Sequence, residues 1–338
     1  MKRTGRLKAA KRPPLLRSSR RAAHTHCFCG GSVNAGDHSD HTNVVTYKPC
    51  TKANYLRQVF WIEKVDVAYV YLEDDITLDY NLSIQEGKTL YLCLNGHTLN
   101  LGQYFIWVGR EGATLYLCDC SAQKTGTVLG GSNCCVSVDD ASDYKATFNM
   151  YSGTLRGGNR TGFGGGVEIV NGTMNMYGGT ITENTATSDG GGIYVGENAS
   201  LTMEGGCVSG NQATRGGGIF GAGSASISIQ GGELRENSAK SGGGIYLRCP
   251  ADISSCRIEN NNCEYNGAGI YAEADREDEI ILSAVDILDN GSAGHGGGIY
   301  IKNCRMDMLS GSVSGNEVTA PHACGGGVYV DEYAGFTM

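Results

Sequence analysis

Apolar and polar residues alternate in short runs through most of the chain, and these runs recur at a nearly fixed spacing. In 193–195 the two outer residues are apolar, and the alternation directs the middle residue to the opposite, solvent-facing side. The same pattern returns at 201–203. Alternation over a few residues predicts a β-strand with one buried face. Three such runs fill each repeat, and helical spacing over ten or more residues is absent from them. The pattern therefore predicts an all-β fold of short strands.

Each repeat opens with a run of glycines, and successive runs start 26, 26, 26, 25, 29 and 29 residues apart. Three strands cannot bury their own apolar face, but stacked repeats place equivalent strands in parallel ladders about 4.8 Å apart. The repeat predicts a right-handed parallel β-helix, a solenoid with about 26 residues and three short strands per coil. The glycine runs start at Gly164, Gly190, Gly216, Gly242, Gly267, Gly296 and Gly325.

Equivalent residues in successive repeats should form columns along the stack. Each glycine run is expected at a sharp corner, where φ > 0 or contact with the next coil excludes a Cβ. Six asparagines follow the third strand, and their stacked amides can bond from coil to coil as an asparagine ladder. The buried column of the first strand should be Ile193, Ile219, Ile245, Ile270, Ile299 and Val328, and the asparagines are Asn184, Asn211, Asn237, Asn261, Asn290 and Asn316.

The motifs GGGIY, GGTITEN and GGCVSGN resemble the repeats of bacterial cell-surface β-helix proteins, related to those of polymorphic outer membrane proteins and common in Gram-positive gut bacteria. The resemblance covers residues 24–338, including the segment 92–99. It implies an adhesive or structural protein that is secreted or displayed on the cell surface. It implies little about chemical activity.

Composition changes along the chain divide it into four segments. Residues 1–23 are basic, with the start and small-residue end of an export signal but no apolar middle, so they are either a degraded signal or a disordered tail. Residues 24–54 are polar and contain Cys and His. Residues 55–88 are the candidate N-terminal cap and first coil, since an open first coil would leave edge strands unpaired. Residues 89–338 form the β-helix, which stops within a coil at Met338 and so predicts a missing C-terminal remainder.

The overall composition excludes several classes of protein. With 52 glycines, 5 prolines and 40% apolar residues in 338, the chain is neither collagen-like nor disordered, and one solenoid domain is the economical interpretation. A net charge of −8 argues against nucleic acid as a partner, because phosphates are neutralised by clustered Lys and Arg. No apolar run reaches the length of about 18 residues that a transmembrane helix needs.

A possible metal site lies in the polar N-terminal segment. Two thiolates and two imidazoles, close together in the sequence, can give Zn²⁺ four tetrahedral ligands and so order a segment that is too polar to fold alone. Their spacing is not that of a standard zinc finger. The alternative is a loosely ordered leader with solvated histidines, and otherwise no cofactor is expected. The four candidate ligands are Cys27, Cys29, His38 and His41.

The 14 cysteines raise the question of disulfides, which are common in exported proteins. Their spacing is irregular, so we expect mostly thiols. The segments 89–93 and 114–118 have the same sequence and should stack directly on each other. Cys93 with Cys118, and Cys118 with Cys120, are therefore the first pairs to examine.

One motif points to catalysis. The tripeptide 294–296 and the dipeptide 301–302 resemble the GHG and RIK motifs of polygalacturonase-like hydrolases. Those enzymes also need carboxylates on neighbouring coils to supply acid and base. His295 stands at a variable turn position, so we expect no catalytic centre there. The residues at its position in other repeats are Asp189, Arg215 and Ser241.

An aromatic column is the candidate binding surface. Alternation directs the middle residue of each first strand to solvent, and in six repeats this residue is aromatic. Such rings stabilise a sheet by about 0.2–1 kcal/mol per pair, or they form an exposed strip that stacks on sugars or buries a partner. We expect a non-catalytic, adhesin-like scaffold that binds glycan or a protein surface here; the alternative is a pectinase-like glycoside hydrolase or lyase. The column is Tyr194, Phe220, Tyr246, Tyr271, Tyr300 and Tyr329.

Overall fold

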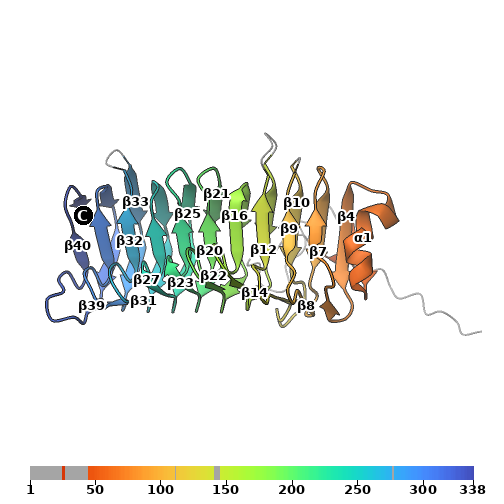
Figure 1. Ribbon diagram of the computed structural model, residues 1–338, viewed down its shortest axis with the longest axis horizontal. Helices are drawn as coiled ribbons and strands as arrows, with labels where there is room; N and C mark the ends of the chain where they lie inside the picture. Colours follow the sequence, from red (N-terminus) through yellow and green to blue (C-terminus); the bar gives the residue numbers. More distant parts are fainter. Residues whose placement is uncertain (1–24, 27–44, 111, 141–144, 276–277) are drawn as a thin grey trace, which may run out of the picture.

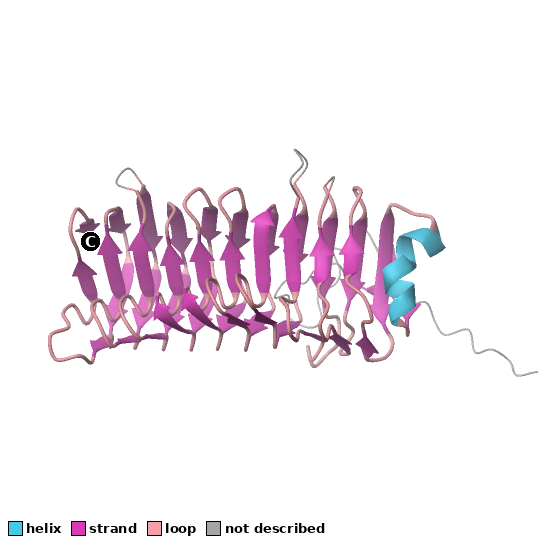
Figure 2. Ribbon diagram, in the orientation of Figure 1, coloured by secondary structure: helices cyan, strands magenta, loops and turns pink. Residues whose placement is uncertain are grey.

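The structure, a computed structural model, describes residues 25–26, 45–110, 112–140, 145–275 and 278–338. In this part the chain winds into about 11 turns of about 26 residues, which stack along one axis as an elongated parallel β-solenoid (Figure 1). Strands and turns make up nearly all of the stack, and a helix stands at one end (Figure 2). The all-β coil architecture predicted from the repeats is confirmed.

Each of the later coils contains four strands, and each strand belongs to a different parallel sheet. The sheets are numbered 1 to 4 in the order in which the chain passes through them within a coil. The three predicted strand positions correspond to sheets 1, 2 and 4. Sheet 3 is an addition to the prediction. Its strands have only two to four residues, which is too short to show a period, so the sequence pattern indicates polar turns there.

The four sheets contain 12, 10, 7 and 10 strands, in the order sheet 1 to sheet 4. Sheet 1 has 12 strands: β3 (Lys48–Cys50), β4 (Val67–Leu72), β7 (Thr89–Cys93), β10 (Thr114–Cys118), β13 (Thr147–Met150), β17 (Thr173–Met176), β21 (Ser200–Met203), β25 (Ser226–Ile229), β29 (Ala251–Ser254), β33 (Glu279–Ser283), β37 (Arg305–Met308) and β41 (Gly335–Thr337). Sheet 2 has 10 strands: β5 (Ile76–Thr77), β8 (Thr98–Asn100), β11 (Thr127–Leu129), β14 (Thr154–Arg156), β18 (Thr180–Thr182), β22 (Cys207–Ser209), β26 (Gly232–Arg235), β30 (Cys256–Glu259), β34 (Val285–Leu288) and β38 (Gly311–Ser314). Sheet 3 has seven strands: β15 (Asn159–Arg160), β19 (Thr185–Ala186), β23 (Gln212–Arg215), β27 (Ser238–Ser241), β31 (Asn262–Cys263), β35 (Gly291–Ser292) and β39 (Glu317–Val318). Sheet 4 has 10 strands: β6 (Leu82–Ile84), β9 (Ile106–Val108), β12 (Val136–Asp139), β16 (Val167–Asn171), β20 (Ile193–Val195), β24 (Ile219–Gly221), β28 (Ile245–Leu247), β32 (Ile270–Glu273), β36 (Ile299–Lys302) and β40 (Val328–Val330).

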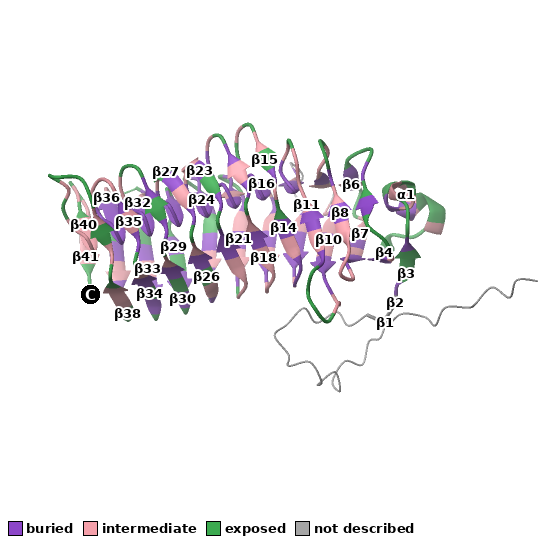
Figure 3. Cartoon of the chain, turned by 90° about the horizontal axis from the view of Figure 1, so that it is seen from below, coloured by how far each residue is buried: buried purple, intermediate pink, exposed green. Residues whose placement is uncertain are grey.

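The core follows the predicted register. Equivalent apolar residues face each other from coil to coil, and buried positions continue along the strands of the stack (Figure 3). The isoleucines of the predicted column in sheet 4 are fully buried, while Val328 in the last coil is half-buried. The predicted stacking of the two identical pentapeptides is also observed, with β7 and β10 paired residue by residue from Thr89 opposite Thr114 to Cys93 opposite Cys118.

The glycine runs form the corner that leads into sheet 4. The first glycine adopts a left-handed conformation, with φ +63° at Gly216, where a Cβ would lie 2.3 Å from the carbonyl oxygen of Ile219. The second approaches the next coil, since a Cβ on Gly217 would lie 2.6 Å from the carbonyl oxygen of Gly243. Both of the predicted reasons for glycine, a positive φ and close contact between coils, are confirmed.

The asparagine ladder is confirmed, and every bond between its asparagines runs in the same direction. The Nδ2 of Asn211 donates to the Oδ1 of Asn237 in the next coil at 3.0 Å and to the carbonyl of Ile181 at 2.9 Å. The same Asn237 Oδ1 also accepts the backbone N–H of Asn211 at 3.0 Å. Because these side chains are buried, each ladder bond satisfies groups that water does not reach.

The N-terminal end of the stack is covered by α1 (Ala53–Glu63), which packs beside β3 and β4 (Figure 2). Leu56 and Val59 of this helix are buried in the main core. The helix overlaps the segment predicted to cap the first coil. The pair β1 (Thr25–His26) and β2 (Val45–Thr46), which is antiparallel, precedes it in the chain.

Candidate functional site

The predicted aromatic column lies on sheet 4, on the side of each strand opposite the main core. Successive rings from Tyr194 to Tyr329 are stacked nearly parallel, with centroids 4.4–5.6 Å apart. Phe220, Tyr246, Tyr271 and Tyr300 are only 2%, 5%, 8% and 6% exposed and form a hydrophobic cluster of their own. The prediction of an exposed aromatic strip is therefore wrong, because each ring is covered by its neighbours in the column.

Residues in the turn before the glycine run cover these rings further. Phe163 stacks on Tyr194 at 4.7 Å, which extends the column by one ring. The Arg215 guanidinium lies 5.6 Å from the ring centroid of Tyr246. His295 stacks on Tyr329 of the following coil at 4.4 Å, as its Nδ1 accepts the backbone N–H of Cys324 at 3.0 Å. The variable turn position thus has a packing role, and ring faces expected to meet sugars already meet protein groups.

Three phenol hydroxyls of the column also have partners within the chain. Those of Tyr246 and Tyr271 donate to Glu273 at 3.0 and 3.5 Å, and Lys302 lies 3.2 Å from the same carboxylate. Tyr300 donates to Asp331. Burial raises the pKa of Tyr246 to about 12, so this hydroxyl keeps its proton at neutral pH. Stacked, buried and hydrogen-bonded, the column is a ladder that stabilises sheet 4.

The bond between Tyr300 and Asp331 predicts an acid-sensitive contribution to stability. The hydrogen bond from Tyr300 lowers the pKa of Asp331 below its ordinary value of 3.8, so the contribution is present above about pH 4 and is lost as the pH falls through the folded-state pKa. Tyr300→Phe should therefore cost about 1 kcal/mol of unfolding free energy at pH 7. Denaturant titrations of both proteins should show this difference shrinking below about pH 4; a pH-independent difference would contradict the assignment.

A groove that the sequence did not predict runs along sheet 3. It crosses six successive strands, from β19 to β39, and has a volume of about 580 Å³. Five steps of about 4.8 Å between neighbouring strands give it a length of about 24 Å. The most buried lining residues are all small and form the floor: Ala186, Ala213, Ala239, Cys263 and Ser292.

Polar side chains line both sides of this floor. One side carries the column that includes Gln212, Ser238 and Asn262, which are in register with one another. The other side includes Lys240 and Glu264, two residues beyond the first column in each coil. The groove therefore presents polar side chains in five of its six coils, around a nearly apolar floor; in the coil of β35 the two sides are Gly291 and Ala293.

The sequence does contain a signal for this groove. A ladder asparagine is followed two positions later by a small residue, as in Asn211-Gln212-Ala213 and Asn237-Ser238-Ala239. Ala186 and Cys263 follow the same rule. Small side chains at one register position of consecutive coils leave a continuous depression, since no side chain fills it.

The metal ligands predicted near the N-terminus, Cys27, Cys29, His38 and His41, lie outside the described residues. Their zinc site stays a prediction. In the part of the chain that is described, one group of three ligating side chains has its ligand atoms close enough together to hold a metal ion. It consists of Cys93, Cys118 and Cys120 and belongs to the early coils.

The stacked parallel strands and inward apolar columns define the class of β-solenoid proteins. Residues 165–338, about half of the chain, match the family model described as right handed beta helix region, and the chain belongs to this family. The domain is found both in pectate lyase-like enzymes and in adhesins. No curated protein and no solved structure gives a significant match to the chain. Over the described residues, no helix combines the length and apolar character that a membrane crossing requires.

Proposed function

We propose that this chain is a non-catalytic β-helix scaffold, secreted or displayed on a bacterial cell surface, that binds an extended glycan along the groove of sheet 3. The observation that carries the proposal is the continuity of the groove over six coils. A short ligand would use one part of it, whereas an extended polymer contacts equivalent groups in coil after coil. The proposal of an adhesin-like protein is supported by the presence of adhesins in the family.

The lining suits a sugar polymer for two reasons. Hydroxyl and amide groups such as Ser238 and Asn262 can exchange hydrogen bonds with sugar hydroxyls, and the small floor residues accept the apolar C–H face of a sugar ring. Each contact is weak, but linked contacts on one chain add up through a high effective concentration. Affinity is therefore expected to rise steeply with the number of sugar units.

A bulky residue in the groove should block binding without disturbing the fold. Ser238→Trp places an indole on the polar side of the groove, and the matched control Ser228→Trp changes the same residue type in the same coil on the outward side of sheet 1. After a glycan array has identified a bound polysaccharide, titration calorimetry with its oligomers should show affinity at least tenfold weaker for Ser238→Trp and unchanged for the control. Thermal unfolding of both variants should match the wild type.

Two outcomes would overturn the proposal. If Ser238→Trp binds the captured glycan as the wild type does, the ligand site is not this groove. If incubation of the wild type with that glycan releases new reducing ends or unsaturated products, the chain is a polysaccharide-processing enzyme. Glu264 and Glu317, the carboxylates of the groove lining, would then be the first residues to substitute.

A further inference from the structure

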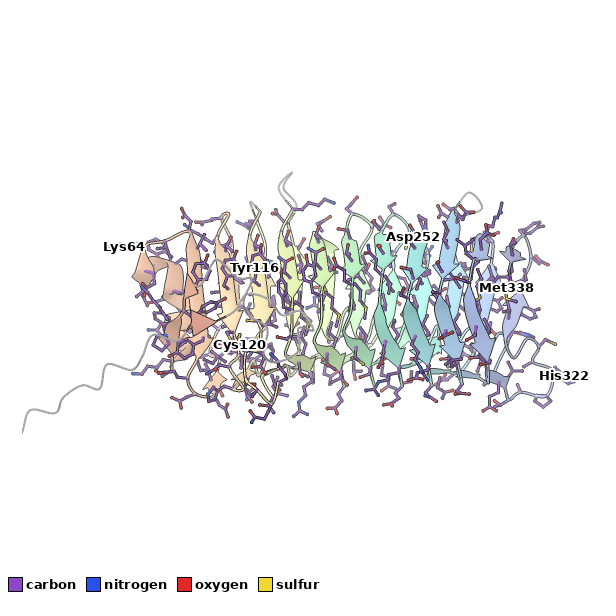
Figure 4. All side chains as sticks on the ribbon, turned by 180° about the vertical axis from the view of Figure 1, so that it is seen from behind. Lys64, Tyr116, Cys120, Asp252, His322 and Met338 are labelled. Carbon is purple, nitrogen blue, oxygen red and sulfur yellow. The ribbon has the colours of Figure 1, made fainter. Side chains whose placement is uncertain are left out.

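Three cysteines converge at the end of two neighbouring strands in the early coils, far from the groove in sequence. Cys93 ends β7 and Cys118 ends β10, and the in-register pairing of these strands places the two residues opposite each other. In each strand the cysteine lies on the same face as the tyrosine, and the two leucines lie on the opposite face. Both cysteines therefore lie outside the main core. Cys120 follows in the next turn; Figure 4 labels it below Tyr116 of the same coil.

The distances between the sulfur atoms suit one metal ion. All three Sγ atoms lie within 4.8 Å of one another, and those of Cys118 and Cys120 are 3.9 Å apart. Thiolates that share a Zn²⁺ with bonds of about 2.3 Å lie about 3.8–4.0 Å from each other in tetrahedral or trigonal geometry. Side-chain rotation alone can therefore close the site, because the two strands and the turn already hold the three Cα atoms in place.

Asp119 fixes the turn that carries Cys120. Its buried carboxylate accepts the backbone N–H groups of Gly96, Ser121 and Gly126 at 2.8, 3.0 and 2.6 Å, and the Ser121 hydroxyl at 2.9 Å. Lys124 donates to the Asp119 carbonyl at 2.7 Å and brings a positive charge to the same turn. This network orders the turn that carries Cys120 before a metal ion binds. Metal binding then does not have to supply the free energy of ordering the turn.

The surroundings are also those of a metal site. Tyr47 and Tyr71 are buried in one cluster with Cys93 and Cys118, and Tyr71 is in register with Cys93 on the preceding strand. These rings form an apolar wall around two of the sulfurs. Cys120 is only partly buried, so the cluster has one accessible side. An apolar shell with one open side admits an ion and leaves a position for a fourth ligand.

We propose that Cys93, Cys118 and Cys120 together bind one Zn²⁺ ion, which links two adjacent coils near the capped end of the stack. Three soft thiolates in this geometry select a thiophilic d¹⁰ cation over the hard cations Mg²⁺ and Ca²⁺. Binding exchanges three S–H bonds for three Zn–S bonds and releases three protons to solvent. This site is independent of the proposed function and of the zinc site predicted at the N-terminus.

Cobalt binding to the reduced full-length chain tests the proposal. The wild type should bind Co²⁺ with the charge-transfer and d–d absorption bands of thiolate ligation, and Zn²⁺ should remove these bands; the variant without Cys27 and Cys29 should bind one equivalent. Cys118→Ser and Cys120→Ser should each weaken binding at least tenfold. The partly exposed Cys207→Ser is the matched control and should bind as the wild type does.

A fourth variant separates this cluster from the N-terminal candidates. Cys27→Ser combined with Cys29→Ser should retain the cobalt bands. Bands that disappear in this double variant but survive Cys118→Ser and Cys120→Ser would overturn the proposal, as would a wild type without thiolate bands. A mass lower by two hydrogens, with a disulfide mapped to Cys118 in protein purified without reductant, would assign the cluster to redox pairing instead.

Discussion

Replacing one ladder asparagine, Asn261→Ala, is expected to lower the free energy of unfolding by about 2–6 kcal/mol, because it leaves two buried donors without an acceptor at about 1–3 kcal/mol each. Those donors are the backbone N–H of Asn237 and one N–H of its Nδ2, both nitrogens being 3.0 Å from the Oδ1 of Asn261; the other Nδ2 hydrogen still bonds to the carbonyl of Val208. The carbonyl of Leu234 and the Oδ1 of Asn290 each lose a bond as well. Alanine can replace none of these contacts.

The neighbouring residue provides the control. Asn262 is exposed and directed away from the ladder, so Asn262→Ala should change the unfolding free energy by less than about 0.5 kcal/mol. Denaturant titration gives the global difference, and hydrogen exchange at the amides of β27, β31 and β35 locates it, because repeat proteins can open locally. Equal stability of the two variants would show that the ladder amides contribute little.

The second large effect is expected at the first glycine of a corner. Gly216→Ala should destabilise the fold by about 3 kcal/mol or more, since the left-handed conformation alone costs alanine about 1–2 kcal/mol and a backbone contact is added to it. The φ of Gly216 is +63°, and the new Cβ would lie 2.3 Å from the Ile219 carbonyl oxygen. Relief of this contact would require movement of the strand that follows.

Gly223→Ala in the same coil is the matched control. The nearest neighbour of its added Cβ is the Arg248 carbonyl oxygen at 3.9 Å, so a change within about 0.5 kcal/mol is expected. Thermal and denaturant unfolding should separate the two variants clearly. A Gly216→Ala protein as stable as Gly223→Ala would mean that the corner can rearrange. The sequence agrees with the expectation, because the first position is glycine in all seven glycine runs, while Ala268 occupies the second position in one of them.

The parts of the fold that the sequence predicts are those in which one backbone position repeats the same constraint. A positive φ at Gly190 recurs at Gly216 and Gly242, and the asparagine that follows each third strand recurs with it. Repetition turns a weak local preference into a clear pattern. The helix α1 lacks such support: its N-cap, Lys52, makes no capping hydrogen bond, and its first turn carries no acidic residue.

The alternation of residues was not enough to predict how far the aromatic column is exposed to solvent. Alternation places Tyr246 on the outward side of sheet 4, but its burial depends on rings about 4.8 Å away in the adjacent coils and on Arg215 from the preceding corner. The centroids of successive rings lie 4.4–5.6 Å apart, so in-register aromatics of adjacent coils cover one another. The groove on sheet 3 was not predicted for the opposite reason, since it is formed by small residues such as Ala213 and Ala239. Their only signal in the sequence is their position two residues after a ladder asparagine.

The one-way asparagine ladder has a consequence for synthesis on the ribosome. Each amide, such as Asn184, donates to the oxygen of the asparagine in the coil that follows it, here Asn211. As the chain emerges from its N-terminus, a coil acquires this acceptor only after the next 24–29 residues have been made. The newest coil of a nascent chain is therefore always incomplete, and folding follows translation one coil behind.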